Sequence, residues 1–255
     1  MSEFEMIAFG HSHLGAVEQA YKNAHKDTPP AERNARFFRL NQKRFQPNSS
    51  VENGRVYLTD SLKRQLSFII EKSDPKAILL CAMGNDYNSM AMLRHPIPFN
   101  FYWPEMDFDD SGMNGAVEIP FDVMKAQMRD SAEQEALMFW QAIREKAHSP
   151  IYLLLPPPPI RAAAHIKEYP GGFAQTVEKY GVSPAGFRLK MHTLYVTVMR
   201  EATAGSGVSI IEAPYRTRDK GFLARPYWSQ DPTHANPRYG AIILEELRKL
   251  TGLEL

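Results

Sequence analysis

The feature that most constrains the fold is a series of five short apolar runs that alternate with longer amphipathic segments. The runs cover residues 5–10, 35–40, 76–83, 150–155 and 208–213. Three of them are apolar nearly throughout, as strands are when helices cover both faces of a parallel sheet. Because parallel strands need crossovers between them, the alternation predicts a doubly wound α/β domain with right-handed connections.

The segments between the runs carry apolar residues at helical spacing. One stripe follows a potential cap at Thr59 and comprises Leu62, Leu66, Ile69 and Ile70. A longer stripe favours a core-facing helix over a cofactor site and comprises Met124, Met128, Ala132, Ala136, Phe139 and Ile143. The last helix should begin at Asn236–Pro237, since Asn caps a helix and Pro suits its first turn. It should bury Ile242, Ile243, Leu247 and Leu250.

Composition narrows the class of protein. A chain of 255 residues without an internal repeat or a low-complexity linker predicts one domain, because single domains extend to about 250 residues. The 30 Lys and Arg residues balance 29 Asp and Glu residues, so we expect no nucleic-acid partner. A single cysteine excludes an intramolecular disulfide, and the acidic N-terminus does not resemble a signal peptide. We therefore expect a cytoplasmic protein, with no membrane span because no apolar run approaches about 18 residues.

Three stretches depart from the alternation, and we expect loop insertions near residues 94–120, 167–186 and 214–230. The first mixes aromatic and acidic residues, the second is rich in Gly and Pro, and the third mixes aromatic and basic residues. Long loops in a compact domain are commonly functional, as lids or substrate walls. The alternative is that their aromatic residues cover a sheet edge or form a contact between subunits.

Reactive side chains follow three of the predicted strands, the third group after the insertion near residues 214–230. Gly-His-Ser-His-Leu occupies residues 10–14, Gly-Asn-Asp-Tyr-Asn occupies residues 84–88, and Asp-Pro-Thr-His occupies residues 231–234, just before the last helix. Ligands of an open parallel sheet bind at the carboxyl ends of its strands. We therefore expect the three groups to converge on one edge of the sheet.

Together these groups supply what acyl transfer needs. Ser12 lies between a strand end and a helix start, where unpaired backbone N–H groups and the helix dipole favour negative charge. A hydroxyl is a weak nucleophile and needs an adjacent base, for which His234 is the candidate. Asp231, three residues earlier, can orient the other imidazole nitrogen. The Asn85 amide can donate to an oxyanion, a contribution worth about 3 kcal/mol in known enzymes.

The joint arrangement of the three groups resembles the block pattern of the SGNH (GDSL) hydrolase family. The resemblance implies a flavodoxin-like three-layer α/β/α fold, formed by one domain over residues 1–255. It also implies a Ser12–His234–Asp231 triad with an oxyanion hole from the Ser12 N–H, a loop glycine and Asn85. Two features depart from the family. His11 stands where an Asp usually precedes the serine, and Gly54 is the glycine available for the oxyanion hole.

The predicted function is that of a serine esterase, acting on O-acyl groups of a carbohydrate or on a small ester, without a metal or another cofactor. Substrate contacts are expected from His11, His13, Asp86, Trp103, Tyr227 and Trp228. Acyl transfer on the same triad, or a fold that binds without catalysing, remain alternatives.

Two other types of hydrolase fit the sequence less well. The His11-x-His13 pair resembles a zinc site of barrel-type hydrolases, if extended backbone turns both rings to one side. A (β/α)₈ barrel needs eight strands, however, and the sequence supports five. An α/β-hydrolase is excluded, because Leu14 stands where its Gly-x-Ser-x-Gly elbow requires glycine.

Overall fold

A five-stranded parallel sheet forms the centre of the molecule, as predicted. The computed structural model describes residues 4–82 and 85–255, with the side chains of Asn85 and Asp86 outside the described part. All five predicted strands are confirmed: β1 (Met6–Gly10), β2 (Ala35–Arg39), β5 (Ala77–Cys81), β8 (Ile151–Leu154) and β9 (Ser209–Ile211). Their order is β2-β1-β5-β8-β9, with every neighbouring pair parallel. The chain therefore changes direction across the sheet at β1, and this switch point is where ligands bind in such folds.

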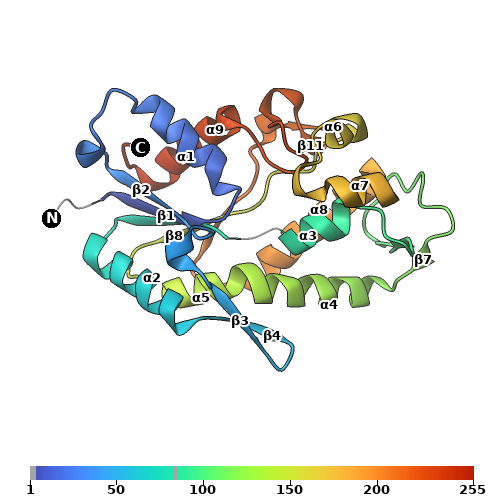
Figure 1. The fold of residues 1–255 in the computed structure, drawn as a ribbon, viewed down its shortest axis with the longest axis horizontal. Helices are drawn as coiled ribbons and strands as arrows, with labels where there is room; N and C mark the ends of the chain where they lie inside the picture. The colour runs from blue at the N-terminus through green and yellow to red at the C-terminus, as the bar shows by residue number, and fades with distance from the viewer. Residues whose placement is uncertain (1–3, 83–84) are drawn as a thin grey trace.

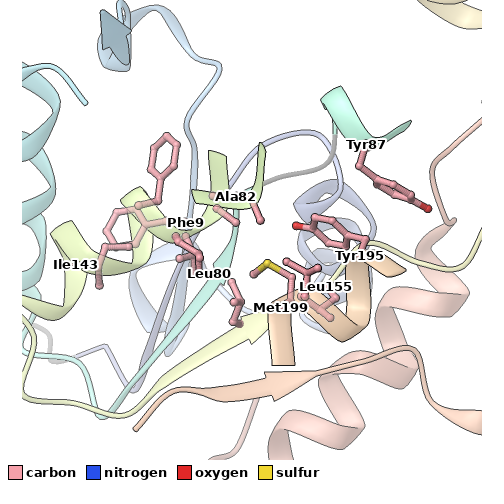
Figure 2. Close-up of a cluster of buried hydrophobic side chains, with 14 of the residues drawn as sticks. Phe9, Leu80, Ala82, Tyr87, Ile143, Leu155, Tyr195 and Met199 are labelled. Carbon is pink, nitrogen blue, oxygen red and sulfur yellow. The ribbon is translucent and has the colours of Figure 1, made fainter. Parts of the chain in front are cut away.

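Helices cover both faces of the sheet (Figure 1). Because successive residues of a strand face opposite sides, Met6 and Ala8 pack with α1 (Leu14–Ala24) and α9 (Pro237–Thr251). Ile7 and Phe9 pack on the other side, against helices that include α2 (Asp60–Ser73), α4 (Phe121–Ala132), α5 (Met138–Arg144) and α8 (Ala185–Thr203). Figure 2 shows Phe9, Leu80 and Met199 meeting in this second cluster. The result is the three-layer α/β/α arrangement expected from the sequence.

The helix ends follow the predicted caps. The Asn236 side chain accepts from the backbone N–H groups of Arg238 and Tyr239, and Pro237 occupies the first turn of α9. Thr59 likewise caps α2. Gly240 lets α9 approach α1 closely, because a Cβ there would lie 2.0 Å from the Ala16 carbonyl oxygen. Leu250, expected to be buried, is 54% exposed, so the buried stripe of α9 ends earlier.

The segment at residues 167–186 differs from the expected loop. It follows α6 (Ala163–Glu168), contains α7 (Ala174–Tyr180) and ends at the start of α8. Its Gly and Pro residues lie at the ends of these helices and do not prevent the helices from forming. Gly181 ends α7 with φ +84°, and Pro184 precedes the first turn of α8. The prediction failed because residues that end helices are as abundant between short helices as in a long loop.

The other two predicted insertions have little regular structure. Residues 94–120 contain the two-residue strands β6 (Phe99–Asn100) and β7 (Val117–Glu118), and residues 214–230 contain β10 (Arg218–Asp219) and β11 (Phe222–Leu223). The buried Lys190 of α8 holds the first insertion in place. Its ammonium group donates to Asn100 Oδ1 at 2.8 Å, to the Phe101 carbonyl at 2.8 Å and to Asp110 Oδ1 at 2.6 Å.

Two further elements border the site. An antiparallel hairpin of β3 (Ser49–Glu52) and β4 (Arg55–Leu58) follows β2, and α3 (Asn85–Met92) follows β5. A π-helical segment, Glu133–Leu137, joins α4 to α5. No helix in the described part of the chain has the length and apolar character needed to cross a membrane.

Candidate active site

Ser12 lies in a tight turn between β1 and α1. The His11 backbone N–H donates to the Cys81 carbonyl at 3.0 Å, and the Ser12 carbonyl accepts from Gly15 N–H at 2.9 Å. Gly10 is needed here for close approach, since a Cβ at this position would lie 2.6 Å from the Cys81 carbonyl oxygen. The turn therefore presents a half-buried serine at the carboxyl edge of the sheet, next to the helix start.

Asp231 and His234 form a hydrogen-bonded pair. The distance between His234 Nδ1 and Asp231 Oδ1 is 2.5 Å. The same carboxylate oxygen accepts from the backbone N–H groups of Thr233 at 2.8 Å and His234 at 2.9 Å. The carboxylate is thus fixed by its own turn before it meets the imidazole. Because Asp231 accepts at Nδ1, the neutral imidazole carries its proton there and leaves Nε2 as the base.

The electrostatics of this pair favour an ionised carboxylate. Burial acts to raise the pKa of Asp231, but the hydrogen bond from the His234 side chain and those from backbone N–H groups outweigh it. The net effect lowers the pKa of Asp231 to about 2. An anion held at this position stabilises an imidazolium on His234. His234 Nε2 itself is buried and has no hydrogen-bond partner.

His13 connects the serine turn to this pair. Its ring lies against the His234 ring, with centroids 4.4 Å apart and planes tilted by 38°. His13 is 8% exposed, and its Nε2 lies 3.4 Å from the Asn88 amide nitrogen. Burial, followed by the nearness of His234, lowers the pKa of His13 to about 3. The structure therefore brings the first and last of the three predicted groups together, with no hydrogen bond from Ser12 to His234 Nε2 among the described atoms.

His11 faces a different part of the molecule. Its Nε2 lies 3.4 Å from the Asn48 amide nitrogen, and its ring meets the edge of Phe139 at a centroid distance of 5.4 Å. Burial lowers the pKa of His11. The zinc alternative required extended backbone that aims His11 and His13 at one metal, but a turn separates the two rings. Within residues 4–82 and 85–255, no three His, Cys, Asp or Glu side chains are placed to hold a metal ion.

A cavity of about 770 Å³ begins at His11. Its walls come from the hairpin β3–β4, from α3 and α7, and from the continuous α4–α5 helix. Ser89 and Met90 of α3 line this cavity, as does Leu93 just after the helix, whereas Asn88 of α3 contacts His13. Helix α3 therefore lies between the cavity and the two neighbouring rings of His13 and His234. The turn that holds Ser12 borders both regions, through His11 on one side and His13 on the other.

Gly54 does not reach the site. It forms the turn of the hairpin β3–β4 together with Asn53, and both residues have positive φ, +76° and +51°. Such a two-residue turn explains the Asn-Gly pair without a catalytic role. No atom lies within 4 Å of a Cβ built on Gly54, so the oxyanion assignment of Gly54 is corrected. Asn85 and Asp86 begin α3, and their side chains lie outside the described part of the chain.

The three aromatic residues expected to contact substrate pack against other side chains of the protein. Trp103 is 6% exposed, packs against Phe121 at a centroid distance of 5.0 Å and donates to Glu105. Trp228 donates its indole N–H to the Leu223 carbonyl at 2.7 Å, and its ring lies beside His165 with the two planes tilted by 50°. Tyr227 meets Tyr239 edge-on. Trp103 is buried and Tyr227 and Trp228 are half-buried, and none of the three rings lines the cavity described above.

The residues that sequence reasoning missed are Asn48, Asn88 and a polar stripe on α4–α5. Asn88 was part of the 84–88 group and carried a usable signal, because it lies about one turn after the start of the helix that follows β5. Asn48 carried none, since it stands in an irregular segment before β3. The polar stripe was hidden by the apolar stripe on the opposite side of the same helix.

Comparison with known proteins gives no family model and no curated protein that matches the chain. Distant similarity exists among solved structures. The periplasmic domain of a lipopolysaccharide acetyltransferase from Salmonella ser. Paratyphi A is 12% identical, with TM-score 0.48, over 97% of this chain and 83% of that one. A GDSL-like lipase from Bacteroides thetaiotaomicron is 12% identical, with TM-score 0.44, over 98% and 90%. A carbohydrate acetylesterase family member from Sinorhizobium meliloti is 11% identical, with TM-score 0.46, over 98% and 100%. Likeness at this level leaves the function to be inferred from the chain's own residues.

Proposed function

We propose that the protein is a serine esterase of the SGNH type, with Ser12 as nucleophile, His234 as general base and Asp231 as the residue that orients it. The observation that carries the proposal is the 2.5 Å bond between Asp231 and His234 Nδ1. This bond leaves a buried, unpartnered Nε2 beside the turn that holds Ser12. A base oriented in this way, next to a serine at a strand end, is the arrangement that hydroxyl nucleophiles require.

The reaction begins when Ser12 Oγ attacks the acyl carbonyl and His234 Nε2 takes the hydroxyl proton. Asp231 stabilises the resulting imidazolium. The tetrahedral intermediate then collapses as His234 returns the proton to the leaving alcohol, which departs and leaves an acyl group on Ser12. Water attacks this ester with His234 again as base, and the acid is released.

The developing oxyanion has donors at the start of α1. Among the described residues, the backbone N–H groups of Ser12 and His13 donate to no backbone carbonyl. Both lie at the positive end of the α1 dipole, where negative charge is stabilised. The Asn85 side chain is proposed as a further donor from its position at the start of α3.

His13 supports this division of roles by staying neutral. Since burial and the nearness of His234 hold the pKa of His13 near 3, His13 does not compete with His234 for the Ser12 proton. The direct Ser12–His234 bond is then expected to form with bound substrate, because catalytic hydrogen bonds are often long in the free enzyme and tighten in the complex.

The test is covalent labelling with a fluorophosphonate probe followed by mass spectrometry of the labelled peptide. The unaltered protein should take one label, on the peptide that contains Ser12, and Ser12→Ala should take none. Ser67→Ala is the matched control, because Ser67 lies on the exposed side of α2 and donates to its own helix. Labelling that survives Ser12→Ala would rule out this nucleophile.

Acyl transfer is a second candidate, and the cavity beside His11 is the observation that favours it. A space of about 770 Å³ can hold an acceptor alcohol in place of water once the acyl group is on Ser12. Product analysis separates the two reactions. A transferase yields a new ester when an acceptor is present, whereas an esterase yields only the free acid.

A further inference from the structure

The cavity beside His11 has the shape of a groove along one helix. Residues of α4, the π-helical segment and α5 line it at helical spacing: Gln127, Asp130, Ser131, Gln134, Glu135 and Phe139. The last of these positions comes twelve places after the first, which corresponds to about 18 Å along a helix. In Figure 1, α4 and α5 run below α3 and α7, whose residues line the other wall. The groove therefore suits an elongated molecule.

The α4–α5 wall is polar over most of this length. We call Gln127, Asp130, Ser131, Gln134 and Glu135 the polar stripe. Gln134 accepts from Val56 N–H at 3.3 Å and donates to Asp130 at 2.6 Å, so the stripe is held in place by the hairpin. The opposite side of α4 buries Met124 and Met128 in the core. The polar face is thus a surface turned to the groove, and the opposing wall adds apolar side chains such as Met90 and Leu93.

Exposure falls along the groove. Gln127 and Asp130 are exposed, Ser131 and Gln134 are half-buried, and Phe139 is 3% exposed. The groove is therefore open at the α4 end and closed at the end where His11 meets Phe139. The buried end of the groove is therefore the end at His11, the residue that directly precedes Ser12 in the turn after β1.

The chemistry of the groove selects among elongated molecules. An acyl chain would take polar groups such as the Gln127 amide and the Ser131 hydroxyl out of water and offer them no hydrogen bond in return, which costs free energy for each group. An anionic chain would meet the carboxylates of Asp130 and Glu135 against one guanidinium, Arg94. Of the histidines in the wall, burial lowers the pKa of His11, which disfavours a positive charge there, and His95 Nε2 lies 3.1 Å from the Met90 carbonyl oxygen. A neutral polyhydroxylated chain satisfies the polar stripe and lays its C–H faces on the apolar wall.

We propose that this groove binds a neutral oligosaccharide, the alcohol part of the ester that Ser12 attacks. The proposal rests on the proposed esterase function for its chemistry, while the binding itself does not depend on catalysis. The acyl group lies at the His11 end, and successive sugar units extend outward along the polar stripe to Gln127.

The test measures binding to the Ser12→Ala protein by isothermal titration calorimetry, so that turnover plays no part. The probes are xylo-, manno-, cello- and chito-oligosaccharides of one to four units, together with oligogalacturonate and octanoate. At least one neutral series should bind, with affinity rising about tenfold or more from one unit to three as added hydrogen bonds accumulate.

Variants of the polar stripe locate the binding. Gln127→Ala should raise the dissociation constant about fivefold through loss of a hydrogen bond, and Ser131→Trp should abolish binding because an indole fills the half-buried middle of the groove. Arg129→Ala is the matched control, since Arg129 lies on the exposed side of the same helix and pairs with Glu133. Thermal unfolding checks that each variant is folded.

Three results would overturn the proposal: tighter binding of octanoate or oligogalacturonate than of every neutral series, no binding of any neutral series, or binding that a folded Ser131→Trp protein retains. Failure of the proposed esterase function is detected separately, by fluorophosphonate labelling that does not depend on Ser12.

Discussion

His11 and His13 flank the same serine, yet they belong to two different regions of the molecule. His13 is enclosed, lies against the His234 ring and shares its region with Asp231. His11 forms the closed end of the cavity with Phe139 and contacts Asn48. Burial lowers the pKa of both, to about 3 for His13. The turn at Ser12 therefore separates a region suited to proton transfer from a region suited to binding.

The turn at His11, Ser12 and His13 thus contributes one histidine to each of the two regions. In extended backbone, residues two positions apart share a side, and His11 and His13 would compete for the same neighbour. The turn bonds from Leu14 N–H to His11 and from Gly15 N–H to Ser12 place them on separate walls. Substitutions in the two regions should accordingly affect different kinetic constants.

The largest effect is expected from Asp231→Asn in the enclosed region. An amide at this position no longer favours the Nδ1–H tautomer or stabilises the imidazolium, and kcat should fall about 10⁴-fold. The loss should be the same for short and long esters, because the substitution lies outside the groove. Steady-state hydrolysis of p-nitrophenyl acetate and of a longer ester measures it. Asp27→Asn, at an exposed position, is the control, and a loss confined to one ester would contradict the separation of the two regions.

A second prediction concerns acid stability and His13. The folded-state pKa of His13, about 3, lies below the unfolded value of 6.5. Between these values the unfolded chain binds a proton that the folded protein excludes. Above pH 6.5 the buried neutral His13 therefore does not reduce the free energy of unfolding. As the pH falls below 6.5, this free energy declines by about 1.4 kcal/mol per pH unit because of His13. His192, whose pKa burial lowers to about 4, acts in the same direction.

His13→Phe keeps a ring against His234 and removes the proton site. Its unfolding free energy, measured by urea titration at pH 4, 5 and 6, should decline less steeply than that of the unaltered protein, by about 1.4 kcal/mol per pH unit. The control is His148→Gln at an exposed position, which should leave the slope unchanged. Parallel profiles for His13→Phe and the unaltered protein would show that His13 takes up charge while folded.

Much of the fold followed from sequence, and the reason is periodicity. The five strands carry apolar residues on both faces, and Asn236–Pro237 caps α9 by a local hydrogen bond, so each signal lies within a few residues. The Asp231–His234 pair was accessible for the same reason, since both belong to one turn.

What sequence could not supply depended on contacts between distant segments. Asn48 meets His11 across 37 positions, and neither residue signals the other. Trp103 resembled a substrate-binding aromatic residue because its neighbours in the sequence are acidic. However, Lys190 donates to Asp110, 80 positions away in the sequence, and so holds the insertion at residues 94–120 against the core. Gly54 was assigned to the oxyanion hole because the family pattern calls for a loop glycine, although an Asn-Gly pair with positive φ is typical of a hairpin turn.

The smallest effect, and the sharpest test of the comparison, comes from His11→Ala at the end of the cavity. The imidazole contacts Asn48 at 3.4 Å and closes the groove, so its removal should raise KM for a long ester about fivefold through loss of one hydrogen bond, with kcat lowered less than KM is raised. Asn48→Ala removes the same contact from the other side. Because the two residues act as a pair, the double variant should be no worse than the more affected single variant. If His11→Ala instead lowers kcat alone and leaves KM unchanged, then His11 acts on the reacting atoms, and the region assigned to binding extends into the chemistry at Ser12.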